Sequence, residues 1–417
     1  MYNKTVLANG VRVVSEKIPG SCTVSLGVWL DVGSRDELPA TSGISHFVEH
    51  MLFKGTQRRT PRDIARKLDS LGGMANAFTS KDTTCLYSTV VDSKLPTLID
   101  LFADMFHNSQ FDADEVGRER QVILQEISMV EDMPEDQIHE IFEDSFWGDN
   151  PLARPVLGDA KVVGAMTGSA LHDYRQKKYA PGKVVISCAG NVDHQELCCL
   201  LEPLFAGSSW GEQAANGRSA PIADRSLAKR VVSRELEQVQ MVLGAKGLEI
   251  TSEERFTLVL LNTILGGNMS SRLFQEVREK RGLAYSISSF IESYTDCGYV
   301  GISCGVAPGS VNETLALVGE QLACLGKEDS LSSAEMGHAL DYARSSVYLA
   351  AENLESRMTR NARNELYFGR HIPLAEVVER FEKVTPAEVS SLAGRIFADD
   401  LCAVVMGPVA ENEVSWS

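Results

Sequence analysis

The two halves of the sequence repeat one order of secondary-structure patterns, and this repetition limits the chain to a duplicated fold. Each half contains a helical pattern that ends at glycine and is followed by two strand-like segments. The helical segments are 61–71 and 271–281, and the strand-like pairs are 74–80 with 83–91 and 283–292 with 298–306. The offset between the halves is about 210 residues, which indicates an internal duplication.

Each half also closes on an apolar strand candidate that follows a helix, 184–189 in the first half and 402–406 in the second. The short turns between the strand-like segments favour antiparallel pairing, because parallel strands need long crossover connections. We therefore expect the α+β class, with two homologous domains that are each a largely antiparallel sheet packed with helices.

Chain length and a low-complexity stretch predict where the two domains meet. A chain of 417 residues exceeds the size at which a single hydrophobic core stops growing, so two domains are expected. Residues 209–230 are rich in Gly, Ser and Ala and show little periodicity, which is typical of a linker. The predicted division is a first domain over 1–208, a linker over 209–230 and a homologous domain over 231–417.

The composition excludes several classes of function. A net charge of −17 repels nucleic-acid phosphates, so we expect no nucleic-acid partner. The same acidic surface serves solubility or, alternatively, attracts basic peptides. No apolar stretch is long enough to span a bilayer and the N-terminus lacks a signal peptide, so a cytoplasmic protein without a membrane partner is expected. The nine cysteines form no C-x-x-C pair, which favours reduced thiols over a cysteine zinc site.

The segment Thr41–Gly55 carries the most informative pattern in the chain. Its apolar residues have the spacing of an amphipathic helix; they are Ile44, Phe47, Val48, Met51 and Leu52. At about 100° per residue, His46, Glu49 and His50 fall on the opposite face. We therefore expect this helix to anchor its apolar stripe in the core and to present two imidazoles, one turn apart, with a carboxylate beside them.

This spacing suits a zinc ion. Residues four apart on a helix have Cβ atoms ~5–6 Å from each other, so His46 and His50 can converge on one ion at ~2.0–2.1 Å. Glu49 cannot comfortably join them as a third ligand, but it can reach a metal-bound water, which is the position of a general base. The order H-x-x-E-H is the inverted zincin motif. The alternative interpretation is two solvated histidines on an exposed helix face.

A third protein ligand must come from elsewhere in the chain. The helical pattern over Asp114–Glu131 offers Glu119 and Glu126, which are two helical turns apart and therefore share a face. Acidic residues on a helix are usually solvated, and the pattern alone does not choose between these two.

Five strings extend the motif over both halves of the chain; they are Gly33–Glu37, Gly43–Thr56, Asn76–Ser80, Arg118–Glu126 and Gly266–Phe274. Together they resemble the pitrilysin, insulysin and mitochondrial processing peptidase family of inverzincin metallopeptidases. The closest resemblance is to the short bacterial members that are similar to processing peptidase subunits. The resemblance implies Zn²⁺ as the cofactor and peptides as substrates.

The resemblance also implies which glutamate completes the metal site. The family's third ligand lies at the position that is Glu126 in this sequence. Glu119 matches another glutamate of the same string, and we expect it to support a ligand or the helix from behind. The alternative for Glu119 is an ordinary surface charge.

Substrate-binding residues are implied in both halves. Asn76, Ala77 and Phe78 match the strand edge along which the family lays an extended peptide, although they could equally form an ordinary strand. Arg278 and Tyr285 match an arginine and a tyrosine near the scissile carbonyl, where a tyrosine could donate a hydrogen bond to the oxyanion. Without the resemblance, Arg278 would be interpreted as a solvated helix charge.

Alignment of the two halves predicts that only the first binds metal. His46, Glu49 and His50 fall opposite Thr257, Leu260 and Leu261, which lack the groups that ligate zinc.

The predicted function is that of a zinc-dependent endopeptidase that hydrolyses extended peptides or unfolded protein segments in a chamber between two clamshell-like halves. The alternative is a non-catalytic peptide-binding or structural partner subunit, although such members of the family typically lose the zinc residues. Because longer relatives join two such halves, we expect a homodimer or a heterodimer with a paralogue. We hypothesise that Arg278 and Tyr285 act in trans, on the metal site of the partner.

Overall fold

The computed structural model describes residues 1–73, 75–206 and 228–416, and the chain forms two compact units. The segments of unit 1 are Met1–Ser128, Arg154–Ala220 and Leu349–His371, and those of unit 2 are Met129–Ala153, Pro221–Tyr348 and Ile372–Ser417. Each unit therefore includes a segment from the other half of the sequence, which the division at 209–230 did not anticipate. Most of that predicted linker, 209–227, lies outside the described residues.

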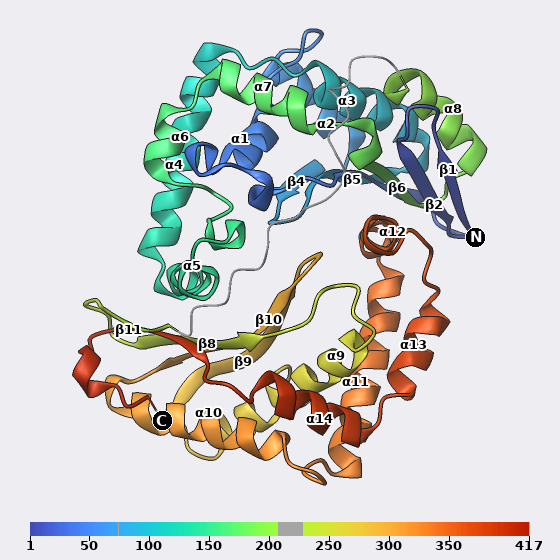
Figure 1. The fold of residues 1–417 in the computed structure, drawn as a ribbon. Coiled ribbons are helices and arrows are strands. Elements are labelled where there is room, and N and C mark those ends of the chain that lie inside the picture. The colour runs from blue at the N-terminus through green and yellow to red at the C-terminus, as the bar shows by residue number, and fades with distance from the viewer. Residues whose placement is uncertain (74, 207–227, 417) are drawn as a thin grey trace. The chain divides into compact units, whose positions relative to one another are not determined.

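Unit 1 is built on a six-stranded sheet with the order β1-β2-β6-β3-β5-β4 (Figure 1). Its strands are β1 (Tyr2–Val6), β2 (Arg12–Lys17), β3 (Thr23–Leu30), β4 (Ala75–Thr79), β5 (Thr84–Val91) and β6 (Val184–Gly190). All neighbouring strands are antiparallel except β2 and β6. Within this sheet β4 is an edge strand, paired with β5 alone.

Unit 2 repeats this topology in a five-stranded sheet with the order β7-β11-β8-β10-β9. Its strands are β7 (Lys229–Ser233), β8 (Val239–Lys246), β9 (Ala284–Ser293), β10 (Gly298–Val306) and β11 (Cys402–Gly407). The order and directions match β2-β6-β3-β5-β4 of unit 1, with one parallel pair, β7 and β11, at the corresponding place. The prediction of two homologous α+β domains with largely antiparallel sheets is confirmed.

Helices flank the two sheets. In unit 1 these are α1 (Ile44–Met51), α2 (Pro61–Leu71), α3 (Leu95–Asn108), α6 (Ala160–Ala165), α7 (Gly168–Lys178), α8 (His194–Phe205) and α12 (Leu354–Phe368). In unit 2 they are α5 (Pro134–Trp147), α9 (Arg255–Leu265), α10 (Val311–Leu325), α13 (Leu374–Glu382) and α14 (Pro386–Ile396). Two long helices, α4 (Ala113–Asp132) and α11 (Ser333–Glu352), run from one unit into the other.

The predicted elements recur with small differences. The helix α2 and the strand β10 have the predicted bounds, whereas α1 is shorter than the segment Thr41–Gly55 that contains it. The helical pattern over 271–281 contains a π-helical stretch, η6 (Phe274–Glu279). There the Lys280 N–H donates to the Gln275 carbonyl, five residues back, at 3.0 Å. A π-turn is a local widening that the apolar periodicity does not reveal.

Both faces of each sheet are buried along its central strands, and one face is covered by a helix from the other half of the sequence. Side chains alternate along β3, so Leu26 and Val28 lie in the main core of unit 1 while Trp29 packs on the opposite face with Met358 of α12. The equivalent face in unit 2 is covered by α5, whose Phe142 stacks near Tyr299. Each half of the sequence thus supplies one helix that covers the sheet of the other half, α5 in one direction and α12 in the other. Each of these helices follows a helix of 20 residues, α4 or α11.

Polar contacts also fix α12 on the sheet of unit 1. Met358 is fully buried, and its sulfur accepts a hydrogen bond from Trp29 Nε1 at 3.2 Å. On either side of it, Arg357 pairs with Glu16 at 2.6 Å and the buried Glu365 pairs with Lys4 at 2.7 Å. Apolar packing and partly buried charge pairs therefore act at the same interface.

The helix α1 is preceded by a glycine, and its start is held by a carboxylate a few residues upstream. Gly43, the residue before α1, has φ 92°, a left-handed conformation that costs glycine no strain. Glu37 accepts hydrogen bonds from the Gly43 and Ser45 N–H groups, each at 2.8 Å, and so satisfies amides that the first helical turn leaves unpaired. Burial raises the pKa of Glu37 to about 7, against these donors and Arg154, which lower it.

Replacing Gly27 by Ala should loosen α12. A Cβ at Gly27 would collide with Met358 Sδ and the Trp29 indole nitrogen, and Met358 is itself fully buried. Overpacking of this kind costs about 1–3 kcal/mol, more than the ~0.5–1 kcal/mol that Ala gains over Gly in a strand. Urea unfolding should show this loss, whereas the control Gly164→Ala, where an added Cβ meets open space, should be neutral or stabilising. Equal effects at the two positions would contradict the packing described for α12.

Replacing Glu37 by Gln should remove a pH-dependent part of the stability. The folded pKa, about 7, exceeds the ordinary value of 4.5, so between these pH values the folded state keeps a proton that the unfolded state has lost. This contribution to the free energy of unfolding is fully present below about pH 4.5 and is lost as the pH rises to about 7. Its total size is on the order of 3 kcal/mol. The free energy of unfolding of the zinc-free wild type, relative to Glu37→Gln, should therefore fall over this range. A difference that does not change with pH would refute the assignment; Glu237→Gln, an exposed glutamate, is the control.

Candidate metal centre

Three groups of the kind that ligate zinc converge at the polar face of α1. The Nε2 atoms of His46 and His50 lie 3.1 Å apart. Glu126 of α4 places Oε2 at 3.8 Å from the first of these nitrogens and at 3.6 Å from the second. All three candidate ligand atoms lie within 4.8 Å of one another. The helix α1 supplies the two imidazoles and α4 supplies the carboxylate.

These distances fit a single tetrahedral ion. With metal–ligand bonds of ~2.0–2.1 Å, two tetrahedral ligand atoms lie roughly 3.4 Å apart, close to the three separations observed. Burial and the neighbouring His50 lower the pKa of His46 to about 3, so its imidazole is neutral and can bind a cation without first releasing a proton. His46 Nδ1 is buried without a hydrogen-bond partner among the described residues, which leaves Nε2 as the nitrogen that faces the other two groups.

Glu119 lies behind His50 and not beside the two Nε2 atoms. Its Oε1 is 2.8 Å from His50 Nδ1, so a proton on Nδ1 would be donated to the carboxylate and the lone pair of Nε2 would face the metal site. Lys54 Nζ is 2.6 Å from the other oxygen of Glu119. The structure therefore separates the two glutamates that the helical pattern could not distinguish.

Glu49 is buried on the same helix, with 7% of its surface exposed. The Thr79 hydroxyl, at the end of β4, donates to Glu49 Oε2 at 2.5 Å. Burial raises the pKa of Glu49 above its ordinary value, which brings the carboxyl closer to the range in which a general base works at neutral pH.

The strand residues predicted to bind substrate lie on β4, next to Thr79. Asn76 and Phe78 are exposed, and Ala77 between them is half-buried. Phe78 packs edge-on against Trp29, with ring centroids 5.4 Å apart. Because β4 pairs with β5 on one side only, its other backbone edge is available to an extended chain.

Arg278 and Tyr285 belong to unit 2 and lie together there. The Arg278 guanidinium is 5.3 Å from the centre of the Tyr285 ring and 4.6 Å from that of Phe274. Tyr285, at the start of β9, is 80% exposed, which is unusual for so large an aromatic side chain. Arg278 itself lies in the π-helical stretch η6, a type of irregularity that is common at functional sites.

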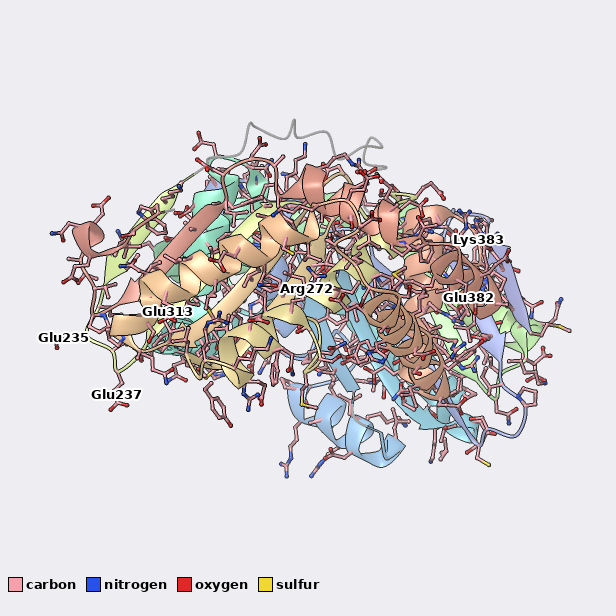
Figure 2. All side chains as sticks on the ribbon, turned by 90° about the horizontal axis from the view of Figure 1, so that it is seen from below. Glu235, Glu237, Arg272, Glu313, Glu382 and Lys383 are labelled. Atoms are coloured by element: carbon pink, nitrogen blue, oxygen red, sulfur yellow. The ribbon has the colours of Figure 1, made fainter. Side chains whose placement is uncertain are left out.

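Arg272, from the string Gly266–Phe274, anchors the chain that leads into η6. Its Nε lies 2.8 Å from Glu335 Oε1, and its Nη2 donates to the Ser330 carbonyl at 2.7 Å. Figure 2 shows Arg272 over the body of unit 2, whereas Glu235 and Glu237 project from its margin.

The place in unit 2 that corresponds to α1 is taken by α9. Thr257, Leu260 and Leu261, which the alignment set opposite the metal motif, are all buried in that helix. They contribute to the apolar core of unit 2, as Leu260 and Leu261 show by their complete burial.

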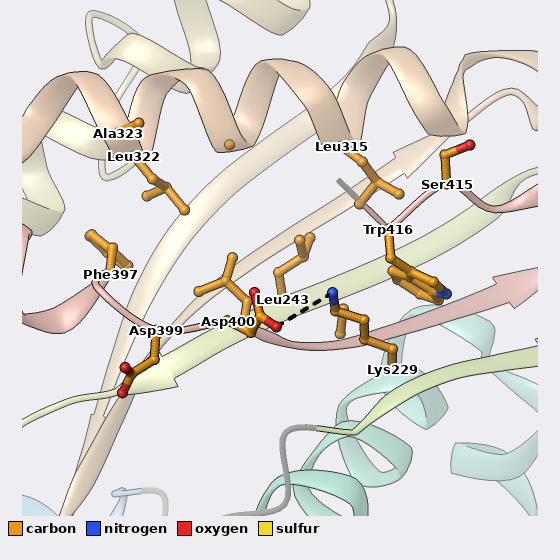
Figure 3. A pocket seen from close by; sticks show the side chains of 13 residues that line it. Lys229, Leu243, Leu315, Leu322, Ala323, Phe397, Asp399, Asp400, Ser415 and Trp416 are labelled. Atoms are coloured by element: carbon orange, nitrogen blue, oxygen red, sulfur yellow. Dashed lines mark ion pairs between the residues drawn. The ribbon is translucent and has the colours of Figure 1, made fainter.

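A pocket of about 200 Å³ in unit 2 has a different character (Figure 3). Leu243, Leu315 and Trp416 form part of its apolar lining, and Lys229 Nζ lies 3.9 Å from Asp400 Oδ2 at its rim. None of its described lining residues is His, Cys or Glu, so it lacks the ligand set found on α1.

Sequence reasoning missed three residues that hold the centre in place, Glu37, Lys54 and Thr79. All three stand in the strings that carry the family resemblance. Lys54 and Thr79 act through contacts with residues distant in sequence, whereas Glu37 acts on amides six and eight residues further along the chain. Over the described part of the chain, no helix is long and apolar enough to cross a membrane.

Comparisons with known proteins identify the family of the chain. Residues 12–160 match the family model described as insulinase (peptidase family M16), and residues 165–341 match the model described as peptidase M16 inactive domain. An uncharacterized zinc protease of Streptomyces coelicolor is 38% identical, over 99% of this chain and 91% of that protein. A second, from Bacillus subtilis, is also 38% identical, over 98% of both chains.

Solved structures share the fold of the whole chain. A protease from Helicobacter pylori superposes with a TM-score of 0.90 at 22% identity, covering 98% of this chain and 99% of that one. A structure from Pseudomonas fluorescens, titled as a peptidase M16 inactive domain, gives a TM-score of 0.90 at 21% identity, covering 98% of each chain. With full-length relatives well above 30% identity and family models that match both halves, the chain belongs to the insulinase family of peptidases, M16.

Proposed function

We propose that this protein is a zinc-dependent endopeptidase that hydrolyses peptide bonds in extended peptides or unfolded protein segments. The observation that carries the proposal is the convergence of His46, His50 and Glu126 on one point, with the buried carboxylate of Glu49 on the same helix. The relatives from Streptomyces coelicolor and Bacillus subtilis, named as zinc proteases, support it.

His46, His50 and Glu126 would hold the ion. A zinc ion with three protein ligands keeps a fourth position for water, lowers the pKa of that water towards ~7 and polarises a carbonyl. Glu49 would accept the proton of the attacking water and deliver it to the leaving amine. Because Thr79 donates to Oε2 of Glu49, Oε1 is the oxygen left to take that proton.

Substrate would be held by the backbone edge of β4 and by groups of unit 2. An extended peptide that pairs with Asn76–Phe78 would be fixed by main-chain hydrogen bonds, which act on any sequence. The Tyr285 hydroxyl would donate to the developing oxyanion, and Arg278, stacked against the same ring, would orient it. The net charge of −17 favours basic peptides among the substrates.

The rival function is that of a non-catalytic peptide-binding or structural subunit. It predicts a metal centre that has lost ligands or the general base. All four residues are present: His46, His50 and Glu126 converge on one point, and Glu49 lies on the same helix as the two histidines, which favours the enzyme.

Two substitutions should separate catalysis from metal binding. Glu49→Gln should keep zinc but lower turnover by about 10²–10⁴-fold, because the amide cannot accept the proton. Glu126→Ala should lose zinc, because it removes a ligand. Metal content by elemental analysis and peptide hydrolysis should be measured on both, with Glu131→Ala, an exposed residue of α4, as the control. Full zinc and activity in Glu126→Ala would exclude that residue as the third ligand.

We further propose that the protein works as a dimer, with an identical chain or a paralogue, in which Arg278 and Tyr285 serve the metal centre of the partner. The metal ligands lie in unit 1 and the two substrate-binding groups lie in unit 2. Longer relatives of the family join two such chains in one polypeptide, which supports dimerisation for a chain of this length.

A subunit-mixing experiment tests the trans arrangement. Glu49→Gln protein and Arg278→Ala/Tyr285→Phe protein, each inactive, are mixed and allowed to exchange subunits. With trans sites, one centre of a mixed dimer carries both defects and the other is intact, so activity should return to a substantial fraction of the wild-type level. With cis sites every centre carries one of the two defects, so no activity should return on mixing. Mixed dimers verified by differential tagging that remain inactive would rule out action in trans.

A further inference from the structure

Lys54 contacts Glu119, the carboxylate behind the candidate ligand His50, and the proposed mechanism gives Lys54 no role. Glu119 is contacted through both oxygens, by His50 Nδ1 at 2.8 Å and by Lys54 Nζ at 2.6 Å. His50 lies in the last turn of α1, and Lys54 follows four residues later, in the turn that ends it. The Glu119 side chain is 7% exposed, whereas that of Lys54 is 31% exposed. Lys54 thus approaches a buried carboxylate from the solvent side.

These two contacts join the end of α1 to α4. Glu119 and Glu126 lie two turns apart on α4 and share one face of it, so any shift of Glu119 against α1 also moves Glu126 against the imidazoles. A single hydrogen bond would leave the carboxylate free to rotate, because the terminal torsion of glutamate is broad. The second, charge-assisted contact from Lys54 removes that freedom and supplies the charge that a buried carboxylate requires.

We propose that Lys54 is a positioning residue for the metal: by clamping Glu119, it fixes the His50 ring and the distance between α1 and α4, and so sets the zinc affinity. The inference rests on the proposed function in taking zinc as the ion. It gives Lys54 no contact with substrate or with the reacting atoms.

The test is zinc affinity, measured on the full-length, zinc-free protein by competition with a chromophoric chelator. Lys54→Met should weaken zinc binding by about 10–100-fold, the usual effect of losing a group that supports a metal ligand. Lys54→Arg keeps the charge and the donors and should restore most of the affinity. Lys67→Met, an exposed lysine of α2, is the matched control and should bind as the wild type does. Zinc-free Lys54→Met should unfold at a lower temperature, because Glu119 stays buried without its counter-charge. A cooperative transition well above the assay temperature separates loss of affinity from loss of fold.

The route through Glu119 is tested by a double-mutant cycle. In a Glu119→Gln background, Lys54→Met should cost little further affinity, because the carboxylate that it holds is gone. An undiminished additional loss would overturn the clamp. So would Lys54→Met protein that binds zinc like the wild type, a result that leaves the proposed peptidase function standing. Wild-type protein that binds no zinc would instead overturn the proposed function, and the role of Lys54 with it.

Discussion

The polar face of α1, which carries the candidate metal ligands, depends on two buried carboxylates, one at each end of the helix. Glu37 accepts hydrogen bonds from backbone amides at the start of the helix, and Glu119 pairs with His50 and Lys54 at its end. A buried carboxylate without donors is costly, so each holds its partners firmly. Together they fix the rotation of the helix and its position along its axis. His46, Glu49 and His50 receive their geometry from these two ends, which support the site through protein contacts.

Four glutamates lie on or beside this short helix, and they differ in their environments. Glu37 and Glu49 are buried, and burial raises the pKa of each carboxyl. Glu126 is 35% exposed at its side chain, which suits a ligand beside an open position, while Glu119 is enclosed by two basic groups. In the proposed peptidase the same functional group would thus serve as a helix anchor, a proton acceptor, a metal ligand and a support, with the surroundings deciding which.

Local patterns in the sequence were sufficient to predict one part of this structure. The α1 motif could be found because helical periodicity alone puts His46, Glu49 and His50 on one face, and the hairpins because glycine and turn residues bound them. The choice of Glu126 over Glu119 needed the packing of α4 against α1, which in the sequence only the family resemblance supplied. Thr79 and Lys54 were missed because each acts on a residue more than a helical turn away in sequence. The destinations of α5 and α12 were hidden for a similar reason: an apolar face indicates burial but not which sheet it covers.

The reciprocal placement of α5 and α12 has a consequence for synthesis of the chain. The strands of the first sheet are complete once β6 has been made, but the helix that covers one of its faces is encoded from Leu354 onward. Until then Trp29, Val185 and their apolar neighbours face water or a chaperone, because a nascent chain that is still being extended cannot close that interface. The first sheet can therefore form early in synthesis, but its packing is completed only after α12 has been made. Premature termination between β6 and α12 leaves the first sheet without the helix that covers one of its faces.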